Sequence, residues 1–119
     1  EIEEAVADAR VNASGNGLTN CEFMTGRTED ILNLLLSKKR RFDIIVSDPP
    51  RAGMHDRALG ALIELASPTV VYVSCNAESL GRDSSHLVKA GYKVDSIQPL
   101  DLFPHTPHCE VAMVLKMGR

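Results

Sequence analysis

The residues best suited to chemistry are one cysteine and two carboxylates that stand at the ends of apolar stretches. Asp48 follows the run FDIIVS, Cys75 follows the run TVVYVS, and Glu110 opens the run EVAMVLKM. A thiolate can act as a nucleophile, and a carboxylate can take a proton from a reacting group. The alternative for Cys75 is an inert thiol that packs as a small apolar side chain.

Two prolines follow the first carboxylate, giving Asp48-Pro49-Pro50-Arg51. Proline restricts its own backbone and that of the preceding residue, and it has no N–H to donate. The triplet therefore ends a strand and holds the Asp48 carboxylate and its neighbouring carbonyls toward a ligand. A rigid turn without further function is the alternative.

Alternating helix and strand patterns surround these residues. Apolar side chains recur at helical spacing in four stretches, Glu3–Ser14, Glu29–Lys38, Arg57–Ala66 and Ala77–Ala90. Short runs rich in β-branched and aromatic residues predict five strands, Cys21–Thr25, Phe42–Ser47, Thr69–Val73, Tyr92–Gln98 and Glu110–Met117.

This order of elements predicts an α/β fold with a mostly parallel sheet and helices on both of its faces. The continuous apolar run at Val70–Val73 is typical of a strand buried on both faces. No helix pattern separates the last two strands, so we expect them to form an antiparallel pair at one edge. The loop between them, Pro99–Cys109, contains three prolines and two histidines.

The fold would bring the three reactive residues together. The carboxyl ends of parallel strands meet at one edge of a sheet, where ligands bind in open α/β folds. Asp48 and Cys75 follow two such strands, and an antiparallel last strand would begin at the same edge, with Glu110. We therefore predict one cleft that holds a thiol and two carboxylates.

Composition narrows the class of protein. The 119 residues are 44% hydrophobic and 24% charged, values typical of a globular domain, and no apolar run is long enough to span a bilayer. Three cysteines without tight spacing favour a reducing, intracellular compartment, cytoplasmic or nuclear, over a disulfide framework. The net charge of −3 does not by itself predict a nucleic-acid partner.

Three motifs in this order resemble one enzyme family. They are DPPRAG at Asp48–Gly53, VSCN at Val73–Asn76, and DLFPHTPHCE at Asp101–Glu110. The combination is similar to the S-adenosylmethionine-dependent RNA uracil-C5 methyltransferases, which form 5-methyluridine in tRNA or rRNA. The resemblance covers nearly the whole chain. It implies that residues 1–119 are part of a catalytic domain with the Rossmann-like sheet of class I methyltransferases, lacking its first strands.

The resemblance also implies roles. Cys75 is the nucleophile that adds to uracil C6, and Glu110 is the base that removes the C5 proton. Asp48 contacts the cofactor, S-adenosylmethionine, or the uracil base. Arg51 contacts RNA phosphate or braces its turn, and Asn76 steadies the cysteine loop or contacts substrate. No metal is implied, because the spacing of the histidines and cysteines matches no tetrahedral zinc pattern.

The chain departs from the family pattern in two places. Ala77 replaces the proline that usually follows SCN, and the chain contains no glycine-rich cofactor loop after a first strand. Glu1 is a candidate ribose ligand, although its spacing is one residue short. Thr28 and Glu29 fall where the family's adenine-side loop is expected. The cofactor site should therefore be incomplete in this chain, and the 119 residues alone inactive.

Two other functions are also compatible with parts of this sequence. A methyltransferase for exocyclic amines also uses an Asp-Pro-Pro turn, but it needs an aromatic residue where Arg51 stands, and it needs no cysteine. A non-enzymatic RNA-binding or scaffold module is the third hypothesis. Without its neighbours, the strand at Cys21–Thr25 is expected either to pair directly with Phe42–Ser47 or to leave an edge through which two chains associate.

Overall fold

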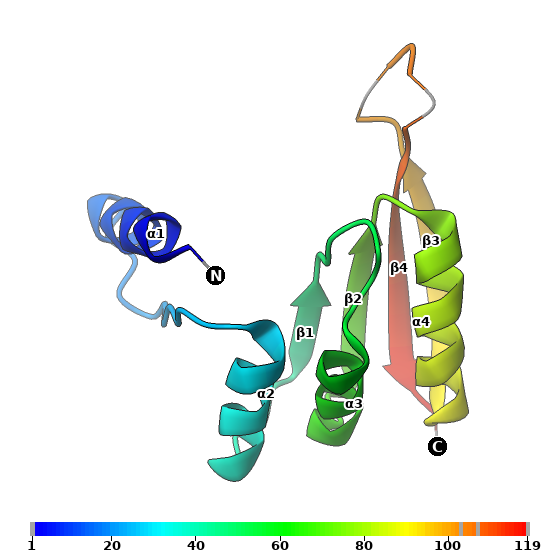
Figure 1. The fold of residues 1–119 in the computed structure, drawn as a ribbon, viewed down its shortest axis with the longest axis horizontal. Coiled ribbons are helices and arrows are strands. Elements are labelled where there is room, and N and C mark those ends of the chain that lie inside the picture. Colours follow the sequence, from blue (N-terminus) through cyan, green and yellow to red (C-terminus); the bar gives the residue numbers. More distant parts are fainter. Residues whose placement is uncertain (1, 103, 107, 119) are drawn as a thin grey trace.

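The computed structural model describes residues 2–102, 104–106 and 108–118. Four helices and four strands follow one another along the chain (Figure 1). They are α1 (Glu3–Gly15), α2 (Thr28–Ser37), β1 (Ile44–Ser47), α3 (Asp56–Leu65), β2 (Thr69–Ser74), α4 (Ala77–Lys89), β3 (Tyr92–Leu100) and β4 (Glu110–Met117). No helix within the described ranges is long and apolar enough to cross a membrane.

The strands form one mixed sheet in the order β1-β2-β4-β3. β1 runs parallel to β2, whereas β4 is antiparallel to both of its neighbours, β2 and β3. Three strands thus share one direction and only the last is reversed, which confirms the predicted α/β class and the antiparallel pair of final strands. β4 itself is not at the edge, because it lies between β2 and β3.

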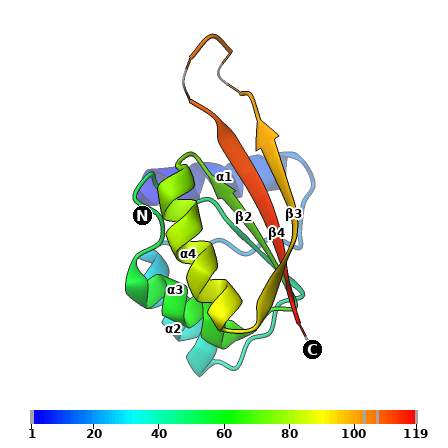
Figure 2. The ribbon, with the colours of Figure 1, turned by 90° about the vertical axis from the view of Figure 1, so that its right-hand side faces the viewer.

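Three helices, α2, α3 and α4, cover the same face of this sheet (Figure 2). Every second residue of β2 is buried, beginning with Val70, since these side chains point toward the helices. α3 and α4 each place an apolar stripe on the sheet. The core they share contains Leu62, Val70, Tyr72, Leu87, Tyr92 and Leu115.

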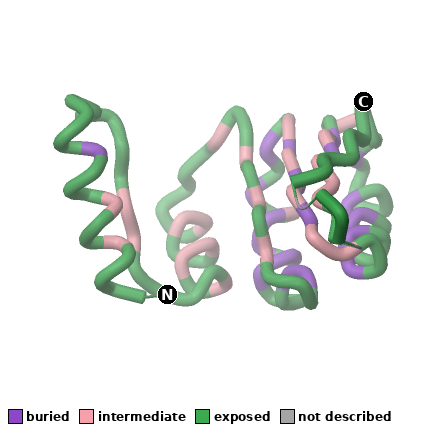
Figure 3. The backbone as a smooth tube through the Cα atoms, turned by 90° about the horizontal axis from the view of Figure 1, so that it is seen from above, coloured by how far each residue is buried: buried purple, intermediate pink, exposed green. Residues whose placement is uncertain are grey.

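None of the helices in the described ranges packs on the opposite face of the sheet. Ile44 and Val46 of β1 are 59% and 67% exposed. The remaining residues of β2 are half-buried, so the prediction of a strand buried on both faces was wrong, as was the prediction of helices on both sides. In Figure 3 the purple of buried residues is concentrated in the centre and on the right, whereas the helix near the N-terminus, on the left, is mostly exposed.

The N-terminal part contains the second departure from prediction. Residues 21–25 form no strand, and β1 pairs only with β2 among the described strands. The expected closure of this segment onto the Phe42–Ser47 strand is therefore wrong. A segment with high β-propensity forms a strand only where a neighbouring strand pairs with it through hydrogen bonds. None of the described strands pairs with residues 21–25. α1 lies apart from the sheet (Figure 1) and holds the segment through Arg10, whose guanidinium donates to the Phe23 carbonyl at 3.1 Å.

Candidate active site at the carboxyl ends of β1 and β2

The parallel pairing of β1 and β2 brings two predicted site residues to one edge of the sheet. Ser47, the last residue of β1, is in register with Tyr72 of β2. Asp48 and Cys75 each follow the last residue of their strand, so both emerge at the same end of the sheet. Asp48 is exposed and Cys75 is a half-buried free thiol.

Glu110 begins at that same end. β4 is antiparallel to β2, with Val111 opposite Ser74. One step beyond this pair stand Glu110 and Cys75, so the backbone register makes them neighbours across the end of the two strands. Glu110 is half-buried. The predicted convergence of the three strand ends is present in the backbone.

Hydrogen bonds fix the turn that carries the cysteine. The Ser74 side chain is 3% exposed, and its Oγ donates to the Asn76 carbonyl at 2.8 Å and accepts from the Asn76 N–H at 3.0 Å. Asn76 also caps α4, since its Oδ1 accepts from the Glu78 N–H at 3.0 Å. The residues on both sides of Cys75 are therefore fixed, and the thiol sits directly before a helix N-terminus.

The cysteine turn is tied to the Asp-Pro-Pro-Arg turn. The Arg51 carbonyl accepts two hydrogen bonds, from Asn76 Nδ2 at 3.2 Å and from Ser79 Oγ at 2.9 Å. The Arg51 backbone thus braces the turn. Its guanidinium is exposed and has no hydrogen bond or ion pair among the described residues, so the cation is available to a ligand.

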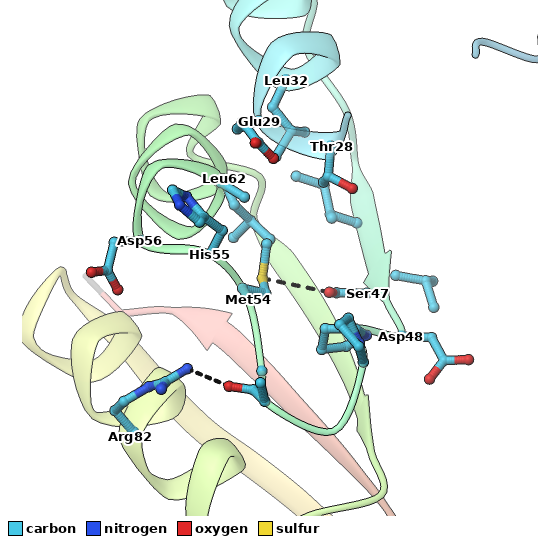
Figure 4. Close-up of a pocket in the computed structure, with 17 residues that line it drawn as sticks. Thr28, Glu29, Leu32, Ser47, Asp48, Met54, His55, Asp56, Leu62 and Arg82 are labelled. Carbon is cyan, nitrogen blue, oxygen red and sulfur yellow. Dashed lines mark hydrogen bonds between the residues drawn. The ribbon is translucent and has the colours of Figure 1, made fainter. Parts of the chain in front are cut away.

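A pocket of about 680 Å³ opens beside Asp48, between α2, β1 and α3 (Figure 4). Thr28 and Glu29 from the first turn of α2 line it together with Asp48 and Met54. Ser47 Oγ lies 3.5 Å from the Met54 sulfur on its floor. The structure thus joins Asp48 to the predicted adenine-side residues, whereas Cys75 and Glu110 do not line this pocket.

A buried acid lies behind the site and was missed from the sequence. Asp83 of α4 is 1% exposed and accepts a hydrogen bond from the Tyr72 hydroxyl. Burial, this hydrogen bond and the negative charge of Asp83 together raise the pKa of Tyr72 well above its usual range. One signal pointed to Asp83: it shares a helical stripe with Leu80 and Leu87, where a charged residue is out of place.

The other two cysteines are not packed against the sheet core. Cys21 and Cys109 are both exposed, and Cys109 Sγ lies 3.5 Å from the Leu100 carbonyl. Cys21 is exposed because its segment does not join the sheet. Glu1, the candidate ribose ligand, lies outside the described residues.

Comparison with known proteins gives a consistent result. The model of the tRNA (uracil-5-)-methyltransferase family matches residues 3–118. An uncharacterised RNA methyltransferase from Clostridium tetani is 46% identical over 97% of this chain. A similar protein from Bacillus anthracis is 44% identical over 98% of it. In both cases the chain spans only 25% of the relative's length.

Solved structures give the same picture. The tRNA (uracil-54, C5)-methyltransferase of Pyrococcus abyssi, solved with S-adenosyl-L-homocysteine, superposes with a TM-score of 0.81 at 37% identity, over 95% of this chain and 26% of that one. An rRNA methylase from Streptococcus thermophilus has a TM-score of 0.72 at 11% identity, over 99% of this chain and 70% of that one. The second similarity concerns the fold alone.

Proposed function

The chain belongs to the tRNA (uracil-5-)-methyltransferase family. We therefore propose that it forms part of the catalytic domain of an enzyme that methylates uracil C5 in either tRNA or rRNA. The observation that supports this most strongly is the pair of hydrogen bonds on the Arg51 carbonyl. They fasten the turn that carries Asp48 to the turn that carries Cys75, at the edge where Glu110 begins β4.

The methyl donor in this proposal is S-adenosylmethionine, which supplies an electrophilic methyl group when bound. The pocket beside Asp48 is suited to one part of this cofactor, since its volume of about 680 Å³ lies within the usual range for small-molecule sites. Thr28, Glu29 and Asp48 are the residues that would hold it. Their oxygens are suited to hydroxyl, amine and ammonium groups.

The chemistry assigned to the chain begins at Cys75. Its thiolate adds to C6 of the uracil, which forms a sulfur–carbon bond and moves the electron pair of the ring double bond toward C5. C5 thereby becomes nucleophilic enough to accept a methyl group. Glu110 then takes the C5 proton, and the returning electron pair expels the thiolate.

Two further residues have supporting roles. The exposed guanidinium of Arg51 contacts RNA phosphate, since a planar, permanently charged donor is well suited to that anion. Asn76 holds the cysteine turn and faces the substrate. Free thiols at all three cysteines agree with a reducing, intracellular compartment, cytoplasmic or nuclear.

The test uses the intact protein that carries this chain, RNA containing 5-fluorouridine, and S-adenosylmethionine. Glu110 cannot remove fluorine as a proton, so a covalent adduct should accumulate at Cys75, visible as a shifted band and as a modified Cys75 peptide in mass spectrometry. Cys75→Ala should give no adduct and no 5-methyluridine, whereas Cys109→Ala, the matched exposed thiol, should leave both. RNA methylation by the Cys75→Ala variant would favour an exocyclic-amine methyltransferase. If the wild-type protein methylates no RNA at all, a scaffold module would be favoured instead.

The 119-residue chain alone is expected to form no adduct, because it represents about a quarter of the length of its relatives and contains only the part of the cofactor site described above. Taken alone, it is also expected to self-associate through the edge of β1, which has no partner strand among the described residues.

A further inference from the structure

The buried carboxylate of Asp83 connects three separate elements. Its Oδ2 accepts from the Tyr72 hydroxyl of β2 and from the Met54 N–H at 2.8 Å, in the loop after β1. Its Oδ1 lies 3.0 Å from Nη2 of Arg82, its neighbour in α4. A carboxylate that is 1% exposed needs this full set of partners, since a buried charge without them is strongly unfavourable.

Arg82 holds the same loop at a second point. Its side chain is 51% exposed, and its Nη2 donates to the Ala52 carbonyl at 2.8 Å (Figure 4). The same Nη2 pairs with Asp83. The two α4 side chains therefore grip the loop on either side of Gly53, at one carbonyl and at one N–H. Both contacts are to backbone groups, so they fix the path of the loop backbone itself.

Gly53 shows how close this contact is. Its φ of +85° is the left-handed region that favours glycine. A Cβ built there would lie 2.6 Å from Arg82 Nη2 and 2.7 Å from Asp83 Oδ2. The loop can approach α4 to this distance only because residue 53 has no side chain.

α4 thus carries both halves of the site. Its N-terminus is capped by Asn76, next to Cys75, and further along the same helix Arg82 and Asp83 hold the loop that begins at Asp48. The spacing between the two halves is set by one rigid helix. Core stability alone does not require an exposed arginine directed at a loop carbonyl.

We propose that Asp83 and Arg82 are positioning residues for methyl transfer, which set the loop of residues 48–54 at a fixed distance from the Cys75 turn. This inference rests on the proposed function, because the cost of a misplaced loop is measured on the reaction assigned to Cys75. Neither residue touches the reacting atoms. Both act through the backbone of the loop.

The test compares Arg82→Ala, Arg82→Lys and Asp83→Asn in the intact protein, at a temperature where circular dichroism shows each variant to be folded. Arg82→Ala should lower kcat by about 10- to 100-fold, since a displacement near 1 Å has a cost of that order, and should change KM for RNA by less than about 2-fold. Arg82→Lys should recover part of kcat, because one ammonium donor can still reach the Ala52 carbonyl. Asp83→Asn should lower kcat at least as far as Arg82→Ala.

The matched control is Ser84→Ala. Ser84 is buried on the same helix, but its Oγ donates only to the Gly81 carbonyl in that helix, so kcat should stay unchanged. Amide hydrogen exchange provides a readout independent of turnover: the peptide of residues 48–54 should exchange faster in Arg82→Ala, while the α4 peptide should not.

Unchanged exchange of this loop, or an unchanged kcat, in Arg82→Ala would overturn the positioning role. So would an equal loss in Ser84→Ala, which would mean that any change in α4 has the same effect. If wild-type protein forms no adduct with 5-fluorouridine RNA, it is instead the proposed function that fails.

Discussion

The two faces of the sheet differ in how far their apolar side chains are buried. On one face, β2 and β4 pack against α3 and α4, and Val70 and Leu115 are completely buried. On the other, Ile44 and Val46 are more than half exposed, although their sequence is as apolar as that of the covered side. Apolar runs of this kind are typical of strands covered on both faces.

The difference shows what an apolar pattern in the sequence specifies. It indicates which side chains are suited to burial, but whether they are buried depends on another segment that packs against them. α3 and α4 were predicted from the same sequence as the strands, and in the structure their apolar stripes pack against β2 and β4. For the bare face and for residues 21–25, no described segment supplies such a partner, and these are the two places where prediction failed.

The largest contrast between the faces is expected for truncated core side chains. Leu62→Ala removes a side chain that is 1% exposed in the covered core, and should lower the free energy of unfolding by about 2–5 kcal/mol. Val46→Ala, on the bare face, should change it by less than about 0.5 kcal/mol. Urea denaturation of the 119-residue chain followed by circular dichroism measures both. An equal loss in the two variants would mean that the bare face is covered in solution.

A smaller effect is expected where the covered side meets the candidate site. Asn76→Ala removes the cap of α4 and should lower the free energy of unfolding by about 1 kcal/mol. Asn76→Asp keeps the oxygen that accepts from the Glu78 N–H but loses the donor to the Arg51 carbonyl. Asn76→Asp should therefore unfold at nearly the wild-type urea concentration. The two variants together separate the contribution of the helix cap from that of the Asn76–Arg51 hydrogen bond. If Asn76→Asp loses as much stability as Asn76→Ala, the effect belongs to the Asn76–Arg51 hydrogen bond instead.

The sequence placed Asp48 and Cys75 at the strand ends where the structure has them, because their signals are local. Asp48 and Cys75 each end an apolar run, and Pro49 and Pro50 mark the strand end without reference to the rest of the fold. The Arg82–Asp83 contact with the loop could not be read in this way. It depends on hydrogen bonds to backbone groups thirty or so residues away, which leave no pattern in side-chain types. Only the charge on an apolar helix stripe hinted at it.

The smallest effect on folding, and the most direct test of the bare face, comes from a charge placed on β1. Val46→Lys puts an ammonium on an exposed position of an edge strand, where lysine commonly prevents pairing between chains. The free energy of unfolding of the monomer should change by less than about 0.5 kcal/mol. Size-exclusion chromatography with light scattering should show that the wild-type 119-residue chain associates as its concentration rises and that the variant does so less. Lys93→Ala, a change on the opposite edge strand β3, should leave association as in wild type. A wild-type chain that stays monomeric throughout would contradict association through β1, and would mean that exposed apolar side chains on a short edge strand are tolerated without a partner.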